Sequence, residues 1–99
     1  MVKIRWTELS VDDLKSIRDY IAQDSVRYAS ITINRIYDRA QILSNQPLAG
    51  RIVPEFDDPK IRELIIGNYR FVYLIINEES IEILRIYNSA RLLKKESLK

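Results

Sequence analysis

Three consecutive β-strands are predicted from residues 61–87, which read IRELIIGNYRFVYLIINEESIEILRIY. The segments 61–66, 69–76 and 81–87 are rich in Ile, Val, Tyr and Phe, the residue types favoured in strands. Gly67-Asn68 separates the first two segments and is the kind of two-residue loop that closes a tight hairpin. The second turn is Asn77-Glu78-Glu79-Ser80. The pattern therefore predicts a three-stranded antiparallel meander.

Upstream of the meander, the chain begins with a short strand that is followed by a helix. Apolar residues alternate with basic ones over residues 2–6, where Val2, Ile4 and Trp6 share one face. The apolar spacing then becomes helical, with the stripe Val11, Leu14, Ile17 and Ile21. Ser10 is the expected N-cap. The residues expected to face water are Asp12, Asp13, Lys15, Arg18 and Asp19.

A second, longer helix follows the break at Gln23-Asp24-Ser25. Its apolar stripe is Ala29, Ile33, Ile36, Ala40 and Leu43. Asp24 or Ser25 is expected to cap it, and Asn45-Gln46-Pro47 is expected to end it. Because so few residues join the two helices, they are predicted to fold back as an antiparallel hairpin.

These elements predict an α+β fold of two layers, in which the helical hairpin covers one face of a sheet made by the meander and the N-terminal strand. The 99 residues are 46% hydrophobic and 30% charged, which is typical of one globular domain spanning residues 1–99. The longest apolar run, residues 71–76, is far shorter than the roughly 20 residues that cross a membrane. No membrane association is expected, and without cysteine or a signal peptide the expected location is the cytoplasm.

The segment 69–76 is apolar on both of its alternating faces, with only Arg70 interrupting. An antiparallel sheet with one wet face normally carries polar residues at alternate positions. Something is therefore expected to cover the face of the sheet away from the helices. Two candidates remain open, the basic C-terminal segment 89–99 with Leu92, Leu93 and Leu98, or a partner protein.

The composition excludes most enzyme chemistry. The chain has no histidine and no cysteine, so the commonest general base, metal ligand and thiol nucleophile are absent. Asp57 and Asp58 precede Pro59 and are expected to be turn residues, and no metal site is predicted. The sequence contains no Walker loop, GxGxxG or GxSxG motif, so no cofactor is expected.

Arginines in and beside the predicted sheet are the main candidates for function. Arginine keeps its charge and grips phosphate or carboxylate with paired hydrogen bonds. These residues either pair with Glu63 or Glu82 across strands or form a cluster that faces an anion. Pairing is favoured for Arg62, whereas both interpretations remain open for Arg70. The set is Arg62, Arg70, Arg85 and Arg91.

The order and spacing of several short strings resemble the RelE/ParE toxins of type II toxin–antitoxin systems, most closely the ParE-like branch. The resemblance covers nearly the whole chain. In the first half, the matching strings are Trp6, Asp13-Leu14 with Ile17 and Tyr20-Ile21, Asp24-Ser25, and Pro47-Leu48-Ala49-Gly50-Arg51 with Val53-Pro54-Glu55. In the second half, they are Ile61-Arg62-Glu63-Leu64, Gly67-Asn68-Tyr69-Arg70 with Tyr73, Ile83-Leu84-Arg85, and Ala90-Arg91-Leu92.

The resemblance implies a cytoplasmic toxin that is held inactive in a hetero-oligomer with a cognate antitoxin. ParE-like members poison DNA gyrase without being enzymes, and RelE-like members cleave mRNA on the ribosome. Asn88 stands where many relatives have histidine, and no aromatic residue follows Tyr87, so the RelE-like catalytic set is incomplete. We therefore expect gyrase poisoning. The alternatives are a ribosome-dependent endoribonuclease and an inactive protein that only binds its antitoxin.

Residue roles follow from this interpretation. The target-binding residues are expected to be Arg62, Arg70, Arg85, Tyr87 and Arg91. The antitoxin is expected to cover an outer apolar face made of Val72, Leu74, Ile76, Leu84 and Ile86. If the protein cleaves RNA, the catalytic candidates are Arg70, Arg91, Glu55 and Glu63.

Overall fold

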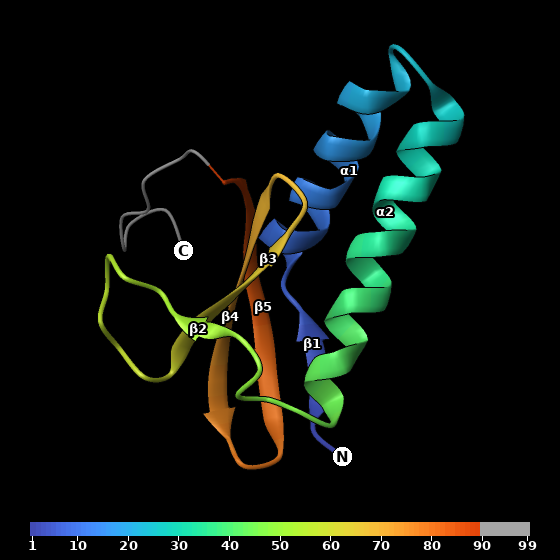
Figure 1. Ribbon diagram of the computed structural model, residues 1–99. Coiled ribbons are helices and arrows are strands. Elements are labelled where there is room, and N and C mark those ends of the chain that lie inside the picture. The colour runs from blue at the N-terminus through green and yellow to red at the C-terminus, as the bar shows by residue number, and fades with distance from the viewer. Residues whose placement is uncertain (90–99) are drawn as a thin grey trace.

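The computed structural model describes residues 1–89 and forms two layers, a helical hairpin and a mixed sheet (Figure 1). The helices are α1 (Glu8–Ala22) and α2 (Val26–Gln41), and α2 continues into a short 3-10 helix, Ile42–Ser44. The strands are β1 (Lys3–Trp6), β2 (Arg51–Ile52), β3 (Ile61–Ile66), β4 (Tyr69–Asn77) and β5 (Ser80–Asn88). The predicted α+β architecture is confirmed, and β2 is an additional short strand. Within residues 1–89, no helix is long and apolar enough to span a bilayer.

The sheet has the order β1-β5-β4-β3-β2. The pairs β5–β4, β4–β3 and β3–β2 are antiparallel, whereas β1 runs parallel to β5 at the edge of the sheet. Gly67 has a φ of 59° in the turn between β3 and β4, a backbone conformation that glycine adopts without strain. The predicted meander is therefore correct, and its second turn is tighter than expected because β5 already begins at Ser80.

The helix caps differ in part from the expected ones. Ser25 caps α2 as predicted, and its hydroxyl accepts a hydrogen bond from the backbone N–H of Tyr28. The prediction of Ser10 as the cap of α1 is wrong, because Thr7 takes that place and accepts from the N–H of Ser10. Ser10 lies buried inside the first turn, where its hydroxyl donates to the carbonyl of Thr7. α1 therefore begins one turn earlier than its apolar stripe indicated.

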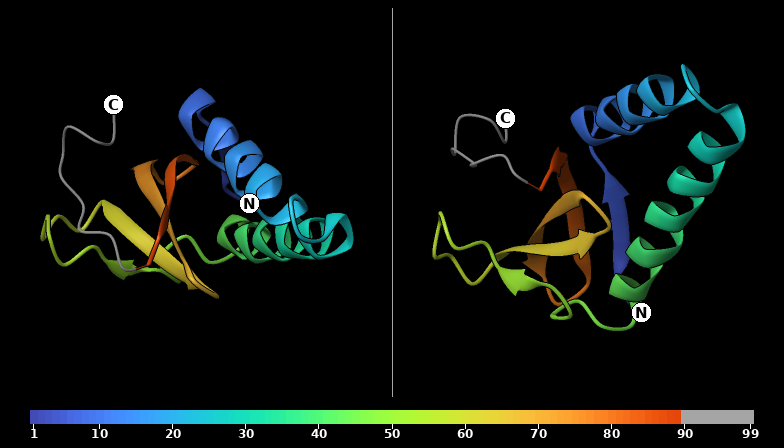
Figure 2. Two further views of the ribbon diagram at one scale, coloured as in Figure 1. Left: turned by 90° about the horizontal axis from the view of Figure 1, so that it is seen from above. Right: turned by 45° about the horizontal axis from the view of Figure 1, so that its top comes forward.

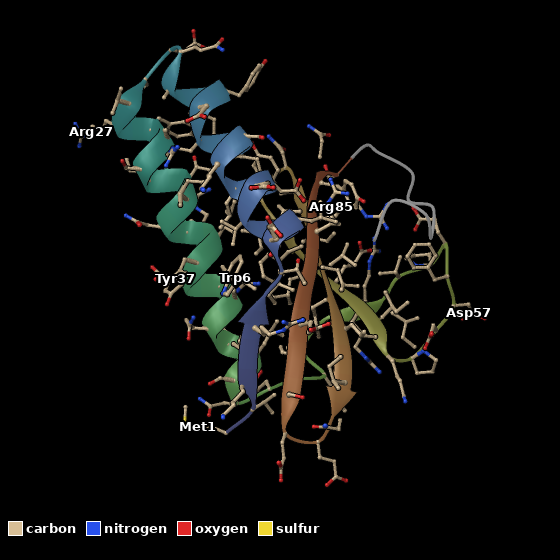
Figure 3. All side chains as sticks on the ribbon, turned by 180° about the vertical axis from the view of Figure 1, so that it is seen from behind. Met1, Trp6, Arg27, Tyr37, Asp57 and Arg85 are labelled. Atoms are coloured by element: carbon tan, nitrogen blue, oxygen red, sulfur yellow. The ribbon has the colours of Figure 1, made fainter. Side chains whose placement is uncertain are left out.

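The main core lies between the helices and the sheet. Ile36, Ala40 and Leu43 from the α2 side meet Phe71, Tyr73 and Ile83 of the sheet. Val2, Ile4 and Trp6 pack against this cluster from the N-terminal strand, as predicted. Trp6 stacks on Tyr37 of α2, with ring centroids 6.2 Å apart, and the two side chains lie next to each other in Figure 3. This contact ties the edge strand to the helical layer.

The opposite face of the sheet is covered in part by the loop between β2 and β3, which lies on the side away from the helices (Figure 2). Val53 and Phe56 of this loop pack with Val72 and Tyr87 in a second apolar cluster. Neither candidate from the sequence included this loop as the cover. The C-terminal segment 90–99 lies outside the described residues.

A β-bulge in the pairing of β4 with β5 changes which side chains share a face. Val72 pairs with Arg85 and Tyr73 with Ile83, so Leu84 is an extra residue on β5. The extra residue shifts the alternation of β5 by one position. Ile86 therefore packs in the core beneath the helices, and the prediction that it shares the outer face with Leu84 is wrong.

Candidate functional site

Four charged side chains form a network on the outer face of the sheet, here called the arginine–glutamate cluster: Arg51, which is 60% exposed, and Glu55, Glu63 and Arg70. Glu55 holds Arg70 with two hydrogen bonds of 2.7 Å, from Nη1 to Oε2 and from Nη2 to Oε1. Glu63 accepts from Arg70 Nε at 2.6 Å and from Arg51 Nε at 2.8 Å. The side chains of Glu63, Arg70 and Glu55 are 0%, 7% and 19% exposed, so the cluster is shielded from water at its centre.

Strand register and a fixed loop bring these residues together. Glu63 pairs with Val72 and Ile65 pairs with Arg70, which makes Glu63 and Arg70 diagonal neighbours on one face of the β3–β4 ladder. Glu55 comes from the β2–β3 loop. The backbone N–H of Val53 donates to Ile61, and the Val53 carbonyl accepts from the N–H groups of Phe56 and Asp57. The loop is thus closed into a tight turn that presents Glu55 to Arg70.

Two hydrogen bonds of the Tyr73 hydroxyl hold the segment that leads into β2. The hydroxyl donates to the carbonyl of Pro47 at 2.8 Å and accepts from the N–H of Gly50 at 2.9 Å. A Cβ atom added to Gly50 would lie 2.7 Å from both the Glu63 carbonyl oxygen and the Tyr73 ring, so only glycine fits. The next residue is Arg51, and this contact therefore sets the position of one member of the cluster. Burial raises the pKa of Tyr73, which keeps the hydroxyl protonated.

The cluster is electrically balanced, with two formal positive and two formal negative charges. The hydrogen bonds from Glu55, and then from Glu63, raise the pKa of Arg70, so the guanidinium stays charged. Glu55 engages Arg70 through both of its oxygens, and Glu63 holds two guanidinium groups. Of the two interpretations that the sequence left open for Arg70, the structure shows cross-strand pairing with Glu63.

Arg62 differs from its neighbours. It was expected to pair with Glu63, but adjacent strand residues point to opposite faces, and within residues 1–89 Arg62 makes no ion pair. Its guanidinium donates instead to the carbonyls of Pro59 and Gly50, at 2.9 and 3.0 Å. These contacts orient the side chain without cancelling its charge.

Arg85 is neutralised by a residue expected to face water. Asp13 of α1 accepts from Arg85 Nε at 2.8 Å and Nη2 at 3.1 Å, and from the backbone N–H of Ile86 at 2.9 Å. The hydrogen bond with Asp13 raises the pKa of Arg85, whose guanidinium also lies 5.0 Å from the centre of the Tyr87 ring. β1 ends at Trp6, so Asp13 takes the place of a neighbouring strand and satisfies the free edge of β5. The prediction that Asp13 faces water is wrong for this reason.

The remaining apolar candidates divide by exposure. Val72 is fully buried under the β2–β3 loop, and Leu84 packs at the margin of the same cluster. Leu74 is partly buried, and Ile76 is exposed near the end of β4. Ile76 lines a hollow of about 550 Å³ together with Leu48, Lys60 and Ile75. Of the proposed antitoxin-binding residues, Leu74 and Ile76 therefore lie at an accessible apolar surface.

Arg91 and the basic residues after it lie outside the described residues. Asp57 has a φ of 51°, and Asp58 accepts from the N–H of Lys60, as expected for turn residues. In the part of the chain that the structure describes, no three His, Cys, Asp or Glu side chains gather as a metal site would require.

The sequence did not single out Arg51 or Asp13 as members of charged pairs. Arg51 follows Gly50, which donates a hydrogen bond to Tyr73. The partner of Arg51, Glu63, is twelve residues away on the next strand. Asp13 occupies an ordinary helical surface position, and its partner is 72 residues away. No local pattern signals contacts of this kind.

Comparisons with known proteins agree with the fold. Residues 4–93 match the family described as the ParE toxin of the type II toxin-antitoxin system, parDE. The chain is 30% identical over 92 residues to Toxin RelE2 of Caulobacter vibrioides (strain ATCC 19089 / CIP 103742 / CB 15), covering 93% of this chain and 100% of that protein. A solved chain of the chromosomal ParDE TA system from P. aeruginosa has a TM-score of 0.73 at 23% identity, covering 89% of this chain and 96% of that one. That structural likeness is one of fold.

Proposed function

The chain belongs to the ParE toxin family of type II toxin–antitoxin systems, and from this premise we propose that it stops growth by binding and poisoning DNA gyrase in the cytoplasm. In this proposal the protein acts as a ligand of gyrase and catalyses no reaction. A cognate antitoxin neutralises it in a hetero-oligomer.

The observation that carries the proposal is that Arg70 is already paired with two carboxylates, those of Glu55 and Glu63. RNA cleavage through a 2′-hydroxyl needs a cation for the phosphorane and a group that accepts a proton. Arg70 is already held by Glu55 and Glu63, and both carboxylates are engaged with guanidinium groups. A phosphate would have to displace a carboxylate from Arg70, and the displaced carboxylate would then lie close to a second anion. The cluster is suited to holding the β2–β3 loop on the sheet.

The second candidate is a ribosome-dependent endoribonuclease, which is favoured by the name of the relative, Toxin RelE2. In that case the β2–β3 loop would open on the ribosome and release Glu55 from Arg70. Glu55 or Glu63 would then serve as base, with Arg70 and Arg91 on the phosphate.

A labelling experiment in cells separates these functions. The toxin is induced in a sensitive bacterial host, and incorporation of labelled thymidine and methionine is followed over the first minutes. We expect DNA synthesis to stop first. Loss of protein synthesis first would support the endoribonuclease, and no effect on either would support a protein that only binds its antitoxin.

Purified components give a direct test. The protein is added to gyrase supercoiling reactions and, in parallel, to a cell-free translation reaction programmed with a reporter mRNA. We expect supercoiling to be inhibited and cleaved gyrase–DNA complexes to accumulate, with the reporter mRNA intact. Cleaved reporter mRNA in the presence of unimpaired supercoiling would refute the gyrase proposal.

We propose Arg62 as a contact to the target, because its charge has no carboxylate partner within residues 1–89. The variant Arg62→Gln is expected to weaken gyrase inhibition. Arg5→Gln is the matched control, since Arg5 lies on the edge strand β1 and is 74% exposed. Equal inhibition by the two folded variants would show that Arg62 makes no contact with the target.

We propose that the antitoxin covers the surface at Leu74 and Ile76. Ile76 on the sheet and Ile31 on α2 are 42% and 43% exposed, so replacing either with glutamate should leave the fold intact. Ile76→Glu is expected to abolish co-elution with the antitoxin in size-exclusion chromatography, whereas Ile31→Glu should retain it. A complex that survives Ile76→Glu and also Leu74→Glu would place the antitoxin elsewhere.

A further inference from the structure

A second candidate site lies on the helical side of the sheet, opposite to the arginine–glutamate cluster, where the β3–β4 turn meets the helical hairpin (Figure 1). A cavity of about 140 Å³ opens there between α1, α2 and the turn. Its apolar lining consists of Ile21, Ile36 and Ile66. None of the proposed roles above involves these residues.

Thr32 of α2 supplies a hydroxyl group to the lining of the cavity. The residue as a whole is only 8% exposed, and no buried side-chain nitrogen or oxygen of the described residues lacks a hydrogen-bond partner. The Thr32 hydroxyl is therefore open to solvent at the cavity. A threonine hydroxyl can donate one hydrogen bond, so this group is placed to donate to a ligand there.

Arg35, one turn further along α2, supplies a positive charge to the same cavity. Within the described residues Arg35 makes no ion pair, unlike Arg51, Arg70 and Arg85. No aspartate or glutamate lines the cavity. Its guanidinium is thus available to an anion from outside.

The remaining polar groups are also hydrogen-bond donors. Tyr28 and Tyr69 line the cavity, and the side-chain amide of Asn68 lies in the turn. Burial raises the pKa of Tyr69, and the neighbouring Tyr28 and Tyr20 raise it further, so its hydroxyl remains protonated. A guanidinium, a threonine hydroxyl and phenol groups around one small space form a donor-rich environment that suits an anion.

The size and charge of the cavity limit which ligands can bind in it. Pockets for whole cofactors or nucleotides usually exceed about 300 Å³, so this cavity accommodates a smaller group. One guanidinium balances one negative charge, which favours a carboxylate over a doubly charged phosphate. The isoleucine lining favours a few methylene or methyl groups beside the carboxylate.

We propose that this cavity binds a carboxylate carried on a short apolar stem, either a small free monocarboxylic acid or the glutamate side chain of a bound protein. Arg35 pairs with the carboxylate, Thr32 donates to it, and the stem lies on Ile36 and Ile66. The site is independent of the gyrase target proposed above.

The test is a titration followed by ¹⁵N–¹H NMR, with isobutyrate as the probe and isobutyramide as its uncharged control. We expect isobutyrate to cause saturable chemical-shift changes at the backbone amides of Thr32, Asn68 and Tyr69, and isobutyramide to cause none. Arg35→Gln should weaken binding at least about tenfold, because a charge-assisted hydrogen bond is lost. Arg39→Gln, an exposed position on the same helix outside the cavity, should bind as the wild type does.

A second titration distinguishes the two sources of the carboxylate. N-acetylglutamate N-methylamide is compared with isobutyrate, and its glutamine counterpart serves as the control. Tighter binding of the glutamate compound would indicate a protein side chain, and tighter binding of isobutyrate a free acid. The proposal is overturned if neither carboxylate gives saturable shifts, if the amides bind equally well, or if Arg35→Gln leaves binding unchanged.

Discussion

Replacing Glu63 with glutamine tests whether the arginine–glutamate cluster holds the outer face of the sheet together. The substitution keeps the size of the side chain but replaces one of its two oxygens with an NH₂ group; Oε1 accepts from Arg70 and Oε2 from Arg51. At least one charge-assisted hydrogen bond is lost, and within residues 1–89 Glu55 remains as the carboxylate partner of Arg70. Breaking a buried ion pair typically costs about 3–5 kcal/mol. We expect Glu63→Gln to lower the free energy of unfolding by roughly 3 kcal/mol, the lower end of this range, because Glu55 still accepts two hydrogen bonds from Arg70.

Urea unfolding measures this loss directly, and thermal unfolding should show a drop in Tm of roughly 12–24 °C for a domain of this size. Glu82→Gln is the matched control. Glu82 also pairs with an arginine, but that partner, Arg5, is 74% exposed, so the expected cost stays below about 1 kcal/mol. If Glu63→Gln were no more destabilising than Glu82→Gln, the cluster would not hold Arg70 in place, and the argument from its occupancy would fail.

Three further changes have defined expectations. Tyr73→Phe should cost about 1–3 kcal/mol in urea unfolding at pH 7, because the buried N–H of Gly50 loses its acceptor. Burial raises the pKa of Tyr73 in the folded protein, so above about pH 10 this tyrosine ionises first in the unfolded chain. The wild type should therefore lose stability there, and the difference in unfolding free energy between it and Tyr73→Phe should narrow. A difference that does not change with pH would show that burial does not raise this pKa. Gly50→Ala should destabilise the protein by about 1–3 kcal/mol through its clash with Tyr73, and an unchanged midpoint would show that the segment can move away. Ser25→Ala should lower the free energy of unfolding by about 1 kcal/mol, because it removes a helix cap. Thr7→Ala should lower it further, because the Thr7 hydroxyl caps α1 and also donates to the carbonyl of Ile83. Equal losses in urea unfolding would mean that the bond to Ile83 contributes nothing.

The candidate site was predictable in its residue types but only partly in its pairings. The sequence indicates Arg70, Glu55 and Glu63 as candidates for RNA cleavage without identifying partners for the two glutamates, because their mutual contacts depend on the β3–β4 register and on the turn that presents Glu55. Arg62 was expected to pair with Glu63 and instead keeps an uncompensated charge. Neighbouring residues of a strand point to opposite faces, so adjacency in the sequence does not predict an ion pair between them.

Local patterns were sufficient for the helical hairpin, the meander and the Gly67-Asn68 turn, because side-chain periodicity and turn chemistry act over a few residues and require no distant partner. Tertiary structure decided the inward position of Ile86, the cover of the outer face by Val53 and Phe56, and the pairing of Asp13 with Arg85. Each depends on a bulge, a loop closure or a strand end that brings together residues far apart in the chain. Such contacts are selected by the packing of the whole domain, because their free energies exist only once the layers have formed.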